Sequence, residues 1–508
     1  MTPTKKPKLG KNRPKKPRDA RSHLGQSIGR TPSSSLIVGI GASAGGLDAF
    51  KTFFANMPPD SGMAFVLVQH LSPDHKSVLA DLIGRMTTMP VVEAENNMPI
   101  ASNTVYVIPP DATLTLKQRS LHVSRPAPPR DRRRPIDTLF SSLAEEHGEN
   151  AICIVLSGTG SDGTLGLKTI KEHGGLTFAQ AEIDHTAKSG MPQSAAATGL
   201  VDEIMPVEEM PAKLLDYQNH LRTVAGRKDG DGTRLDATDH LAKISALLRA
   251  RVGHDFSKYK EKTLIRRIQR RMQVLQIDTV QAYIARLRED PHQVELLFRE
   301  LLIGVTQFFR DPDAFAALAT AAIPKILDNV EAEDQIRLWV PGCATGEEVY
   351  SVAILLKEAL NDREAVPSVQ IFGTDIDNNA IAIARAGRYR TTTGLSSQRL
   401  ARWFVEEGEE YCPIKPIREM CVFSTHSVVK DPPFSKLDLI SCRNLLIYLD
   451  TDLQDRILKV FHYALKPDGI LFLGPAEGVT RHSKLFGTLD KKHRIFRRLS
   501  AEITLPDA

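Results

Sequence analysis

The apolar positions of this 508-residue chain form several short continuous runs, each followed by glycine or polar residues. Runs of about four to eight apolar residues are typical of strands buried on both faces of a parallel sheet. Polar residues and glycines directly after such a run are expected where a strand turns into a helix. The pattern therefore predicts α/β architecture. The clearest runs lie at 36–40, 63–68 and 151–156. Three more, at 336–340, 369–372 and 436–440, are largely apolar but include polar or charged residues.

Length and composition change this picture only in the number of domains. A chain of 508 residues exceeds one hydrophobic core and suggests roughly two to four domains. The hydrophobic fraction of 42% and the charged fraction of 25% are typical of globular proteins. No apolar run approaches the ~20 residues that span a bilayer, so we expect a cytoplasmic protein without an integral membrane segment. The five cysteines are scattered without C-x-x-C spacing, so neither a disulfide framework nor a metal site is indicated.

A glycine-rich turn follows the first predicted strand and contains Ser43. Small residues around this serine allow a sharp strand-to-helix turn, which is the position of a nucleophile. Two later predicted strands end close to His70 and Asp162. Because the carboxyl ends of parallel strands meet in one crevice, we expect a Ser43–His70–Asp162 triad for acyl transfer. The G-x-S-x-G pattern also occurs in α/β-hydrolases, where histidine follows aspartate, so His173 and His185 stay open as alternatives.

A second glycine-bearing turn, at 341–346, follows the predicted strand 336–340. Gly342 and Gly346 allow backbone to approach a ligand at the start of the next helix. Asp375 ends the following strand, where a carboxylate can accept hydrogen bonds from ribose hydroxyls. The turn lacks the G-x-G-x-x-G pattern that cradles a pyrophosphate. A nucleoside without phosphates, such as S-adenosylmethionine, fits this combination.

Positive charge is concentrated in two places. Residues 1–33 carry many lysines and arginines among prolines and glycines, which predicts a disordered basic arm. The segment 258–272 is amphipathic, with apolar residues at helical spacing on the face expected to be buried. Its arginines are expected to form a cationic patch on the exposed face that suits acidic helices or phosphates. These arginines are Arg266, Arg267, Arg270 and Arg271.

The amino-terminal motifs resemble the catalytic domain of the chemotaxis protein-glutamate methylesterases. The resemblance is carried in order by segments 41–46, 68–70, 105–111, 134–140, 156–163 and 190–192. It implies Ser43 as nucleophile, His70 as general base and Asp162 as its orienter, with an oxyanion hole made by backbone N–H groups beside Ser43. The implied substrate is a glutamyl methyl ester, or a glutamine amide to be deamidated, on a chemoreceptor helix. The family usually carries a receiver domain ahead of this one, and we expect the basic arm at 1–33 to be too short to be one.

The carboxy-terminal motifs resemble the chemotaxis receptor methyltransferases, from about residue 255 to 498. Relatives often have asparagine at the positions of Gly304 and Ser427, which we expect to loosen the donor pocket. The arginine-rich helix would contact acidic receptor helices. The resemblance implies Thr306 and Arg310 near the donor's methionine part, Glu347 near its amino group, Asp375 on its ribose, Ser427 near its adenosine, and Arg443, Asn444 and Tyr448 at the transfer site, with Asn444 also contacting the donor.

The sequence thus predicts two doubly wound parallel-sheet domains, the second Rossmann-like with a helical amino-terminal subdomain and a small β insert. The predicted boundaries are a basic arm at 1–33, a methylesterase domain at 34–206, a linker with helices at 207–250, a helical receptor-binding subdomain at 251–312, a methyltransferase domain at 313–500 with a β subdomain at about 388–420, and a tail at 501–508.

The predicted function is a bifunctional enzyme that methylates receptor glutamates with S-adenosylmethionine, yielding S-adenosylhomocysteine, and hydrolyses the resulting esters. The partners would be cytoplasmic helices of methyl-accepting chemoreceptors, with signalling kinases or response regulators as further candidates. A non-catalytic receptor-binding adaptor is the alternative. A nucleic-acid methyltransferase is a second alternative, supported only by the basic segments. Because each activity would undo the other, we hypothesise that the two domains occlude one another's receptor site.

Overall fold

The computed structural model describes residues 36–500 apart from 44, 71–78, 126–133, 182–189, 227–237, 303, 329, 362, 364–365 and 409. The predicted basic arm at 1–33, residues 227–237 of the predicted linker and the tail at 501–508 therefore lie outside the described residues.

The amino-terminal domain is built on a seven-stranded sheet in the order β10-β9-β8-β1-β2-β5-β3. All neighbouring strands in it are parallel, as predicted. The central strands β1 and β8 are fully buried, which explains their continuous apolar sequences. The strands are β1 (Ile37–Ala42), β2 (Ala64–Gln69), β3 (Val91–Glu93), β5 (Thr104–Val107), β8 (Ala151–Val155), β9 (Leu176–Gln180) and β10 (Glu203–Met205).

Helices cover both faces of this sheet. Apolar residues of α1, α2 and α6 pack on one face, and those of α3, α4 and α5 pack on the other. A small antiparallel sheet in the order β4-β7-β6 is added between β3 and α3. The helices are α1 (Gly46–Asn56), α2 (Leu79–Gly84), α3 (Pro135–His147), α4 (Thr164–Glu172), α5 (Gly190–Ala197) and α6 (Met210–Gly226), and the small strands are β4 (Met98–Pro99), β6 (Thr113–Lys117) and β7 (Ser120–Ser124).

The segment predicted as a linker with helices, 207–250, is divided between two folded units. Met210 and Leu214 of α6 are buried in the core of the amino-terminal domain. Leu241, Ile244 and Leu248 belong to a separate helical core. That core is formed by the helical subdomain, which comprises α7 (Thr238–Val252), α8 (Glu261–Val274), α9 (Val280–Glu289) and α10 (Pro291–Leu302).

The carboxy-terminal domain has a seven-stranded sheet in the order β15-β12-β11-β16-β17-β19-β18. The pairs from β15 to β17 are parallel. The parallel pairing predicted from the sequence is found across these strands, and one edge adds antiparallel pairs, because β19 pairs antiparallel with both β17 and β18. The strands are β11 (Gln335–Pro341), β12 (Ser368–Asp375), β15 (Cys421–Thr425), β16 (Leu437–Cys442), β17 (Leu465–Leu473), β18 (Phe486–Asp490) and β19 (Ile495–Arg498).

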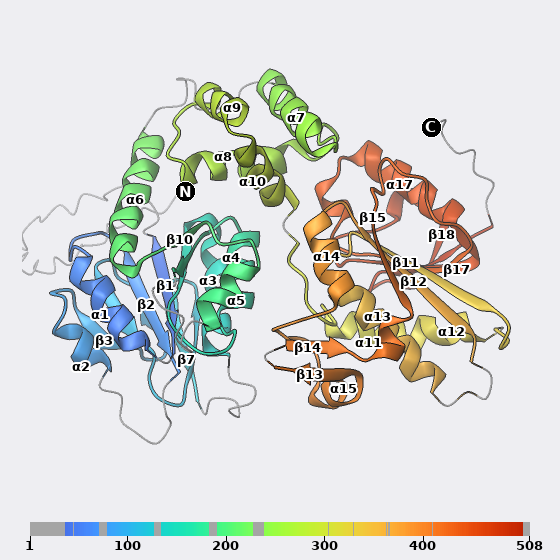
Figure 1. Ribbon diagram of the computed structural model, residues 1–508, viewed down its shortest axis with the longest axis horizontal. Helices are drawn as coiled ribbons and strands as arrows, with labels where there is room; N and C mark the ends of the chain where they lie inside the picture. Colours follow the sequence, from blue (N-terminus) through green and yellow to red (C-terminus); the bar gives the residue numbers. More distant parts are fainter. Residues whose placement is uncertain are drawn as a thin grey trace, which may run out of the picture.

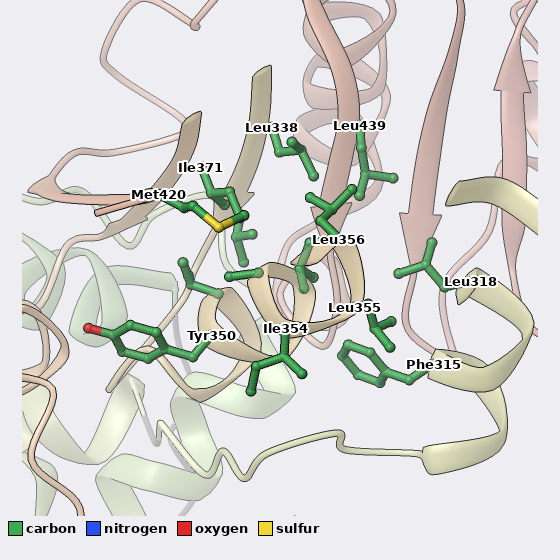
Figure 2. Packing of buried hydrophobic residues seen from close by; sticks show 14 of the residues in the cluster. Phe315, Leu318, Leu338, Tyr350, Ile354, Leu355, Leu356, Ile371, Met420 and Leu439 are labelled. Carbon is green, nitrogen blue, oxygen red and sulfur yellow. The ribbon is translucent and has the colours of Figure 1, made fainter. Parts of the chain in front are cut away.

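Helices also cover both faces of this second sheet. Figure 2 shows one side, where Ile354, Leu355 and Leu356 of α13 pack near Leu338 and Leu439 of the strands. Helix α17 packs on the opposite side. An antiparallel pair, β13 and β14, lies within the segment predicted as a small β insert, about 388–420. The elements not yet given are α11 (Pro312–Ala317), α12 (Ile323–Leu327), α13 (Glu347–Leu360), α14 (Asn378–Ala386), α15 (Ser397–Trp403), β13 (Phe404–Glu407), β14 (Glu410–Pro413), α16 (Lys415–Arg418) and α17 (Thr451–Ala464).

The two sheet domains lie beside one another, and the helical subdomain runs above both (Figure 1). Helix α8 of that subdomain contacts α6 of the amino-terminal domain. Among the helices in the described part of the chain, none combines the length and apolar character needed to cross a membrane.

Candidate active sites

Three predicted catalytic side chains meet at the carboxyl ends of central strands in the amino-terminal sheet. Ser43 follows β1, His70 follows β2, and Asp162 lies between β8 and α4. Ser43 Oγ is 3.3 Å from His70 Nδ1, and His70 Nε2 is 2.8 Å from Asp162 Oδ2. A histidine protonated on Nε2 donates to the carboxylate and leaves Nδ1 to accept the serine proton. The arrangement has the geometry of an activated serine nucleophile.

Backbone N–H groups hold the carboxylate of Asp162 in place. Its oxygens accept hydrogen bonds from the N–H groups of Ile136 at 3.1 Å, Asp137 at 2.9 Å and Gly163 at 2.9 Å. Asp162 is only 5% exposed. Because the donors come from the first turn of α3 and the start of α4, two helix amino-termini fix the group that orients His70.

A second carboxyl group, Asp137, lies buried beside Asp162 and was not assigned from the sequence. Its Oδ1 accepts a hydrogen bond from the Gly166 N–H at 2.8 Å, whereas Oδ2 has no hydrogen-bond partner among the described residues. Burial raises the pKa of Asp137 to about 7, and the charge of Asp162 adds to the effect. The triad aspartate therefore has a neighbour that titrates near neutrality.

The turn around Ser43 is tight. A Cβ on Gly46 would lie 2.4 Å from the Cβ of Ala42, so only glycine fits at the start of α1. The N–H of Ser43 donates to the carbonyl of Ser157 at 2.9 Å. The expected oxyanion hole therefore cannot use this N–H as it stands, and the next residue, 44, lies outside the described residues.

The alternative histidines do not replace His70. His173 is at the far end of α4, where Nδ1 lies 2.9 Å from the Thr169 carbonyl oxygen. His185 lies outside the described residues.

A pocket opens at the carboxyl ends of β11, β12 and β16 in the carboxy-terminal domain. It encloses about 1100 Å³ of empty space, part of it open to solvent. Several residues predicted for the donor and transfer sites line this one pocket, together with Gly304. They are Thr306, Arg310, Asp375, Ser427, Arg443, Asn444 and Tyr448.

Asp375 lies at the end of β12, as the sequence predicts. Its Oδ2 accepts from the Ala344 N–H at 2.9 Å, and its Oδ1 accepts from the Asp377 N–H at 2.9 Å. Burial raises the pKa of Asp375, while these N–H groups oppose that rise. The glycine turn thus fixes the carboxylate at the pocket wall, and Gly346, with φ of 93°, begins α13 beside it.

Arg443 is held rigidly at the inner wall of the pocket. Its side chain is 0% exposed and donates to Asp311 Oδ2 at 2.6 Å and to Glu348 Oε2 at 3.4 Å. The guanidinium also lies over the rings of Phe315 and Phe472. Its Nε atom is buried without a hydrogen-bond partner among the described residues.

Glu348, and not the predicted Glu347, lines the pocket. Its Oε1 accepts from Ser441 Oγ at 2.7 Å. The side chain of Glu347 instead accepts from Thr345 Oγ1 at 2.6 Å. The two glutamates are adjacent at the start of α13, so the sequence alone leaves their directions undetermined.

Glu477 shapes the loop that carries Asn444 and Tyr448, and it was missed from the sequence. The carboxylate accepts from the N–H groups of Gly474 at 2.7 Å, Asn444 at 3.0 Å and Leu446 at 2.7 Å. Asn444 has φ of 58°, in the left-handed region that asparagine tolerates better than most residues.

Ser427 has a local role in addition to lining the pocket. Its Oγ accepts from the N–H groups of Val429 and Lys430, each at 3.3 Å. The hydroxyl therefore holds a turn at the pocket edge. His426, next to it, also lines the pocket and has a buried Nδ1 without a hydrogen-bond partner among the described residues.

The prediction of an exposed arginine patch on α8 is wrong for three of its four members. Arg267 and Arg270 are each 2% exposed and Arg271 is 6% exposed, whereas Arg266 is exposed. Arg271 donates to Gln293 Oε1 within the helical subdomain. Arg267 and Arg270 face the amino-terminal domain, which covers the side of α8 that an isolated helix would present to water.

Comparisons with known proteins match the two sheet domains and the helical subdomain to known families. Three family models match: CheB methylesterase at residues 38–214, the CheR methyltransferase all-alpha domain at 239–302 and the CheR SAM-binding domain at 304–495. A chemotaxis protein methyltransferase of Klebsiella aerogenes is 31% identical, over 50% of this chain and 88% of its own length. The chain belongs to the CheR methyltransferase family. It also carries a CheB methylesterase domain, so both units are of enzyme families.

Two further relatives mark the extent of this likeness. A protein-glutamate methylesterase/protein-glutamine glutaminase of Geobacter metallireducens is 36% identical, over 36% of this chain and 52% of its own length. An uncharacterized 104.1 kDa protein in the hypE 3′ region of Rhodobacter capsulatus is 37% identical over 83% of this chain. The chain spans 46% of the length of that Rhodobacter protein.

The pocket of the CheR domain fits a nucleoside methyl donor. The buried carboxylate of Asp375 ends a strand at its wall, in the position suited to a ribose. Arg310 offers a guanidinium, and His426 Nδ1 is a buried polar atom to which none of the described residues is hydrogen-bonded. Apolar side chains, among them Leu445 and Val428, supply the remaining surface.

Proposed function

We propose that this chain both attaches and removes methyl groups on chemoreceptor glutamates, at the cytoplasmic side of the membrane. The observation that supports this most strongly is that one chain holds a serine–histidine–aspartate cluster and a separate pocket with a buried strand-end carboxylate, each inside the matching family domain. The burial of Arg267 and Arg270 weakens the alternative of a nucleic-acid methyltransferase, because these arginines are not available to phosphates.

In the CheB domain, His70 takes the proton from Ser43 Oγ as that oxygen attacks the ester carbonyl of a glutamyl methyl ester. His70 then gives this proton to the departing methanol, and Asp162 stabilises the imidazolium in between. Water, activated by the same histidine, releases the glutamate from the serine. A glutamine amide would follow the same course with ammonia as the leaving group.

In the CheR domain, S-adenosylmethionine supplies an electrophilic methyl group when bound. We assign Asp375 to its ribose, and Thr306, Arg310 and Ser427 to its polar ends, because all four line the pocket. Arg443 and Tyr448 would orient the acceptor carboxylate, with Asn444 between acceptor and donor. Glu348 and Asp311 hold Arg443 in place, so the chain contributes chiefly by positioning the reactants.

The test uses tritiated S-adenosylmethionine and bacterial membrane vesicles that contain chemoreceptors. The full chain is expected to label the receptor with base-labile methyl groups and to release labelled methanol. Asp375→Ala should abolish labelling. No label on any membrane protein with Ser43→Ala, in which hydrolysis is blocked, would refute the transferase activity.

A further inference from the structure

The CheB domain and the helical subdomain of CheR share a buried network of charges. Lys171 Nζ of α4 lies 2.6 Å from Asp202 Oδ1 and 2.5 Å from Glu300 Oε2 of α10. Arg270 Nη2 lies 3.1 Å from Asp202 Oδ2. Each of these side chains is at most 5% exposed. Burial alone would raise the pKa of Asp202, but the Lys171 and Arg270 cations hold it well below its ordinary value. The two domains are therefore joined by buried ion pairs, and separating the partners without rehydrating them would leave uncompensated buried charges.

Two arginines of α8 also donate hydrogen bonds to backbone carbonyl groups at the carboxyl-terminal end of α4 and just beyond it. Arg267 donates to the carbonyls of Lys171 at 3.1 Å and Glu172 at 2.9 Å. Arg270 donates to the carbonyl of Gly175 at 2.8 Å. The last carbonyls of a helix lack partners within it and carry partial negative charge. Arginines expected to meet an acidic receptor helix thus hold the negative end of a helix from the same chain.

The side chain of Glu172 extends from this helix end toward the pocket of the CheR domain. Its Oε1 lies 3.2 Å from Nη2 of Arg310, a residue that lines the pocket. Tyr448 also lines the pocket, and its pKa is raised by burial and then by the charge of Glu172. A glutamate carboxylate carried on a helix therefore pairs with Arg310 at the rim of the methyl-transfer pocket.

Given the two activities proposed for this chain, we propose that Glu172 occupies the position of the acceptor glutamate from within the chain. The docked CheB domain is then an intramolecular stand-in for the receptor helix. It matches the expected acceptor in chemistry, because each presents a glutamate carboxylate on a helix at the rim of this pocket. The ion pair with Arg310 also engages a side chain that we assign to the donor, so Glu172 sits where donor and acceptor meet. A receptor helix must displace α4 from this position before it can be methylated. Docking in this way limits methylation while the two domains remain in contact.

The test compares full-length wild type with Glu172→Gln, which keeps the shape of the side chain and removes its charge. Methyl transfer is measured against the concentration of receptor-containing vesicles. Because the Glu172–Arg310 pair is partly exposed, its loss should lower the KM for the receptor by about two- to fivefold at unchanged kcat. Glu172→Asp, which keeps the charge but withdraws it by one methylene, should give an intermediate KM.

Glu208→Gln, an exposed position in the same domain, is the matched control and should leave KM unchanged. Thermal unfolding checks that each variant is folded. An unchanged or higher KM in Glu172→Gln would overturn the inference. If wild type and variants all fail to transfer methyl groups, the proposed activity fails instead. Co-sedimentation with the vesicles then decides the inference, which requires tighter binding by Glu172→Gln and is overturned by equal binding.

Discussion

At the scale of single residues, both sites depend on carboxylates that backbone N–H groups hold at strand ends. Asp162 accepts three such hydrogen bonds and Asp375 accepts two. A carboxylate fixed in this way needs no rearrangement when it orients a histidine or binds a hydroxyl. The positions of Ser43, His70, Asp162 and Asp375 at strand ends follow from the apolar runs in the sequence. The N–H groups of Ile136, Asp137 and Ala344, which also hold these carboxylates, come from distant segments and could not be predicted.

Ser43→Ala tests the nucleophile. In the proposed mechanism Ser43 Oγ attacks the ester carbonyl, methanol leaves and an acyl-serine forms. Without Oγ this acyl-serine cannot form. Methanol release should fall by at least about 10³-fold, while transfer from S-adenosylmethionine is unchanged. Methanol is measured from receptor vesicles labelled beforehand. Retention of more than a tenth of the wild-type rate would exclude Ser43 as the nucleophile.

Asp137 predicts a pH dependence of stability. Its pKa is raised from 3.8 to about 7, so between these pH values the folded protein holds a proton that the unfolded chain has released. This contribution to stability is therefore present below pH 3.8 and is lost as the pH rises through about 7. Asp137→Asn should remove that loss.

Thermal unfolding of Asp137→Asn and wild type at pH 5 and pH 8 measures the difference. The variant should gain stability relative to wild type at pH 8, where the wild-type Asp137 carboxylate is charged and buried beside the charge of Asp162. Arg134 is the other charged group that faces this position, and it opposes the rise in the pKa of Asp137. The same difference in melting temperature at both pH values would contradict a raised pKa at Asp137.

At the scale of elements, α8 shows where a periodic pattern stops being informative. The spacing of Ile268 and Met272 predicts the face that is buried in the helical subdomain, and both are buried there. The same pattern predicts solvent on the arginine side, but another domain covers Arg267 and Arg270. Hydrophobic periodicity records burial within one core, and it is blind to a polar interface between domains. The antiparallel edge formed by β18 and β19 was also missed. The direction of a strand depends on how the chain connects it to the neighbouring strand, and the apolar pattern within the strand does not record this.

Glu477 predicts the behaviour of the loop after β16. Glu477→Leu would leave the N–H groups of Gly474, Asn444 and Leu446 without an acceptor. Each orphaned buried N–H costs about 1–3 kcal/mol, so the variant should melt several degrees lower and bind S-adenosylmethionine more weakly. Calorimetry of binding and unfolding measures both. Glu419→Leu, an exposed residue of the same domain, is the control, and equal effects of the two changes would contradict the role of Glu477.

At the scale of the whole molecule, the two enzymes form one assembly through charged side chains. The methylesterase loop also touches the CheR domain, since Ser161 Oγ, next to Asp162, lies 3.5 Å from the Arg390 carbonyl oxygen. Sequence motifs predict the two domains and the residues proposed for each site. They could not predict this docking. The sequence does not show whether a charged residue such as lysine, aspartate or arginine faces solvent or another domain.

Glu300→Ala should open this interface. The change leaves Lys171 without one of its two buried carboxylate partners, and breaking a buried ion pair typically costs about 3–5 kcal/mol. Glu295→Ala on the same helix removes an exposed partner of Arg251 and should change the melting temperature little. Differential scanning calorimetry compares the two variants. Equal melting temperatures would show that the network does not stabilise docking.

The most direct measurement follows one tritiated methyl group through both sites. Receptor vesicles, tritiated S-adenosylmethionine and full-length protein are mixed, and label is counted in receptor and in methanol over time. Wild type should label the receptor transiently and pass the label to methanol, whereas Ser43→Ala should accumulate labelled receptor and release none. Methanol released at equal rates by both proteins, or receptor left unlabelled by both, would contradict the account of two opposed activities in one chain.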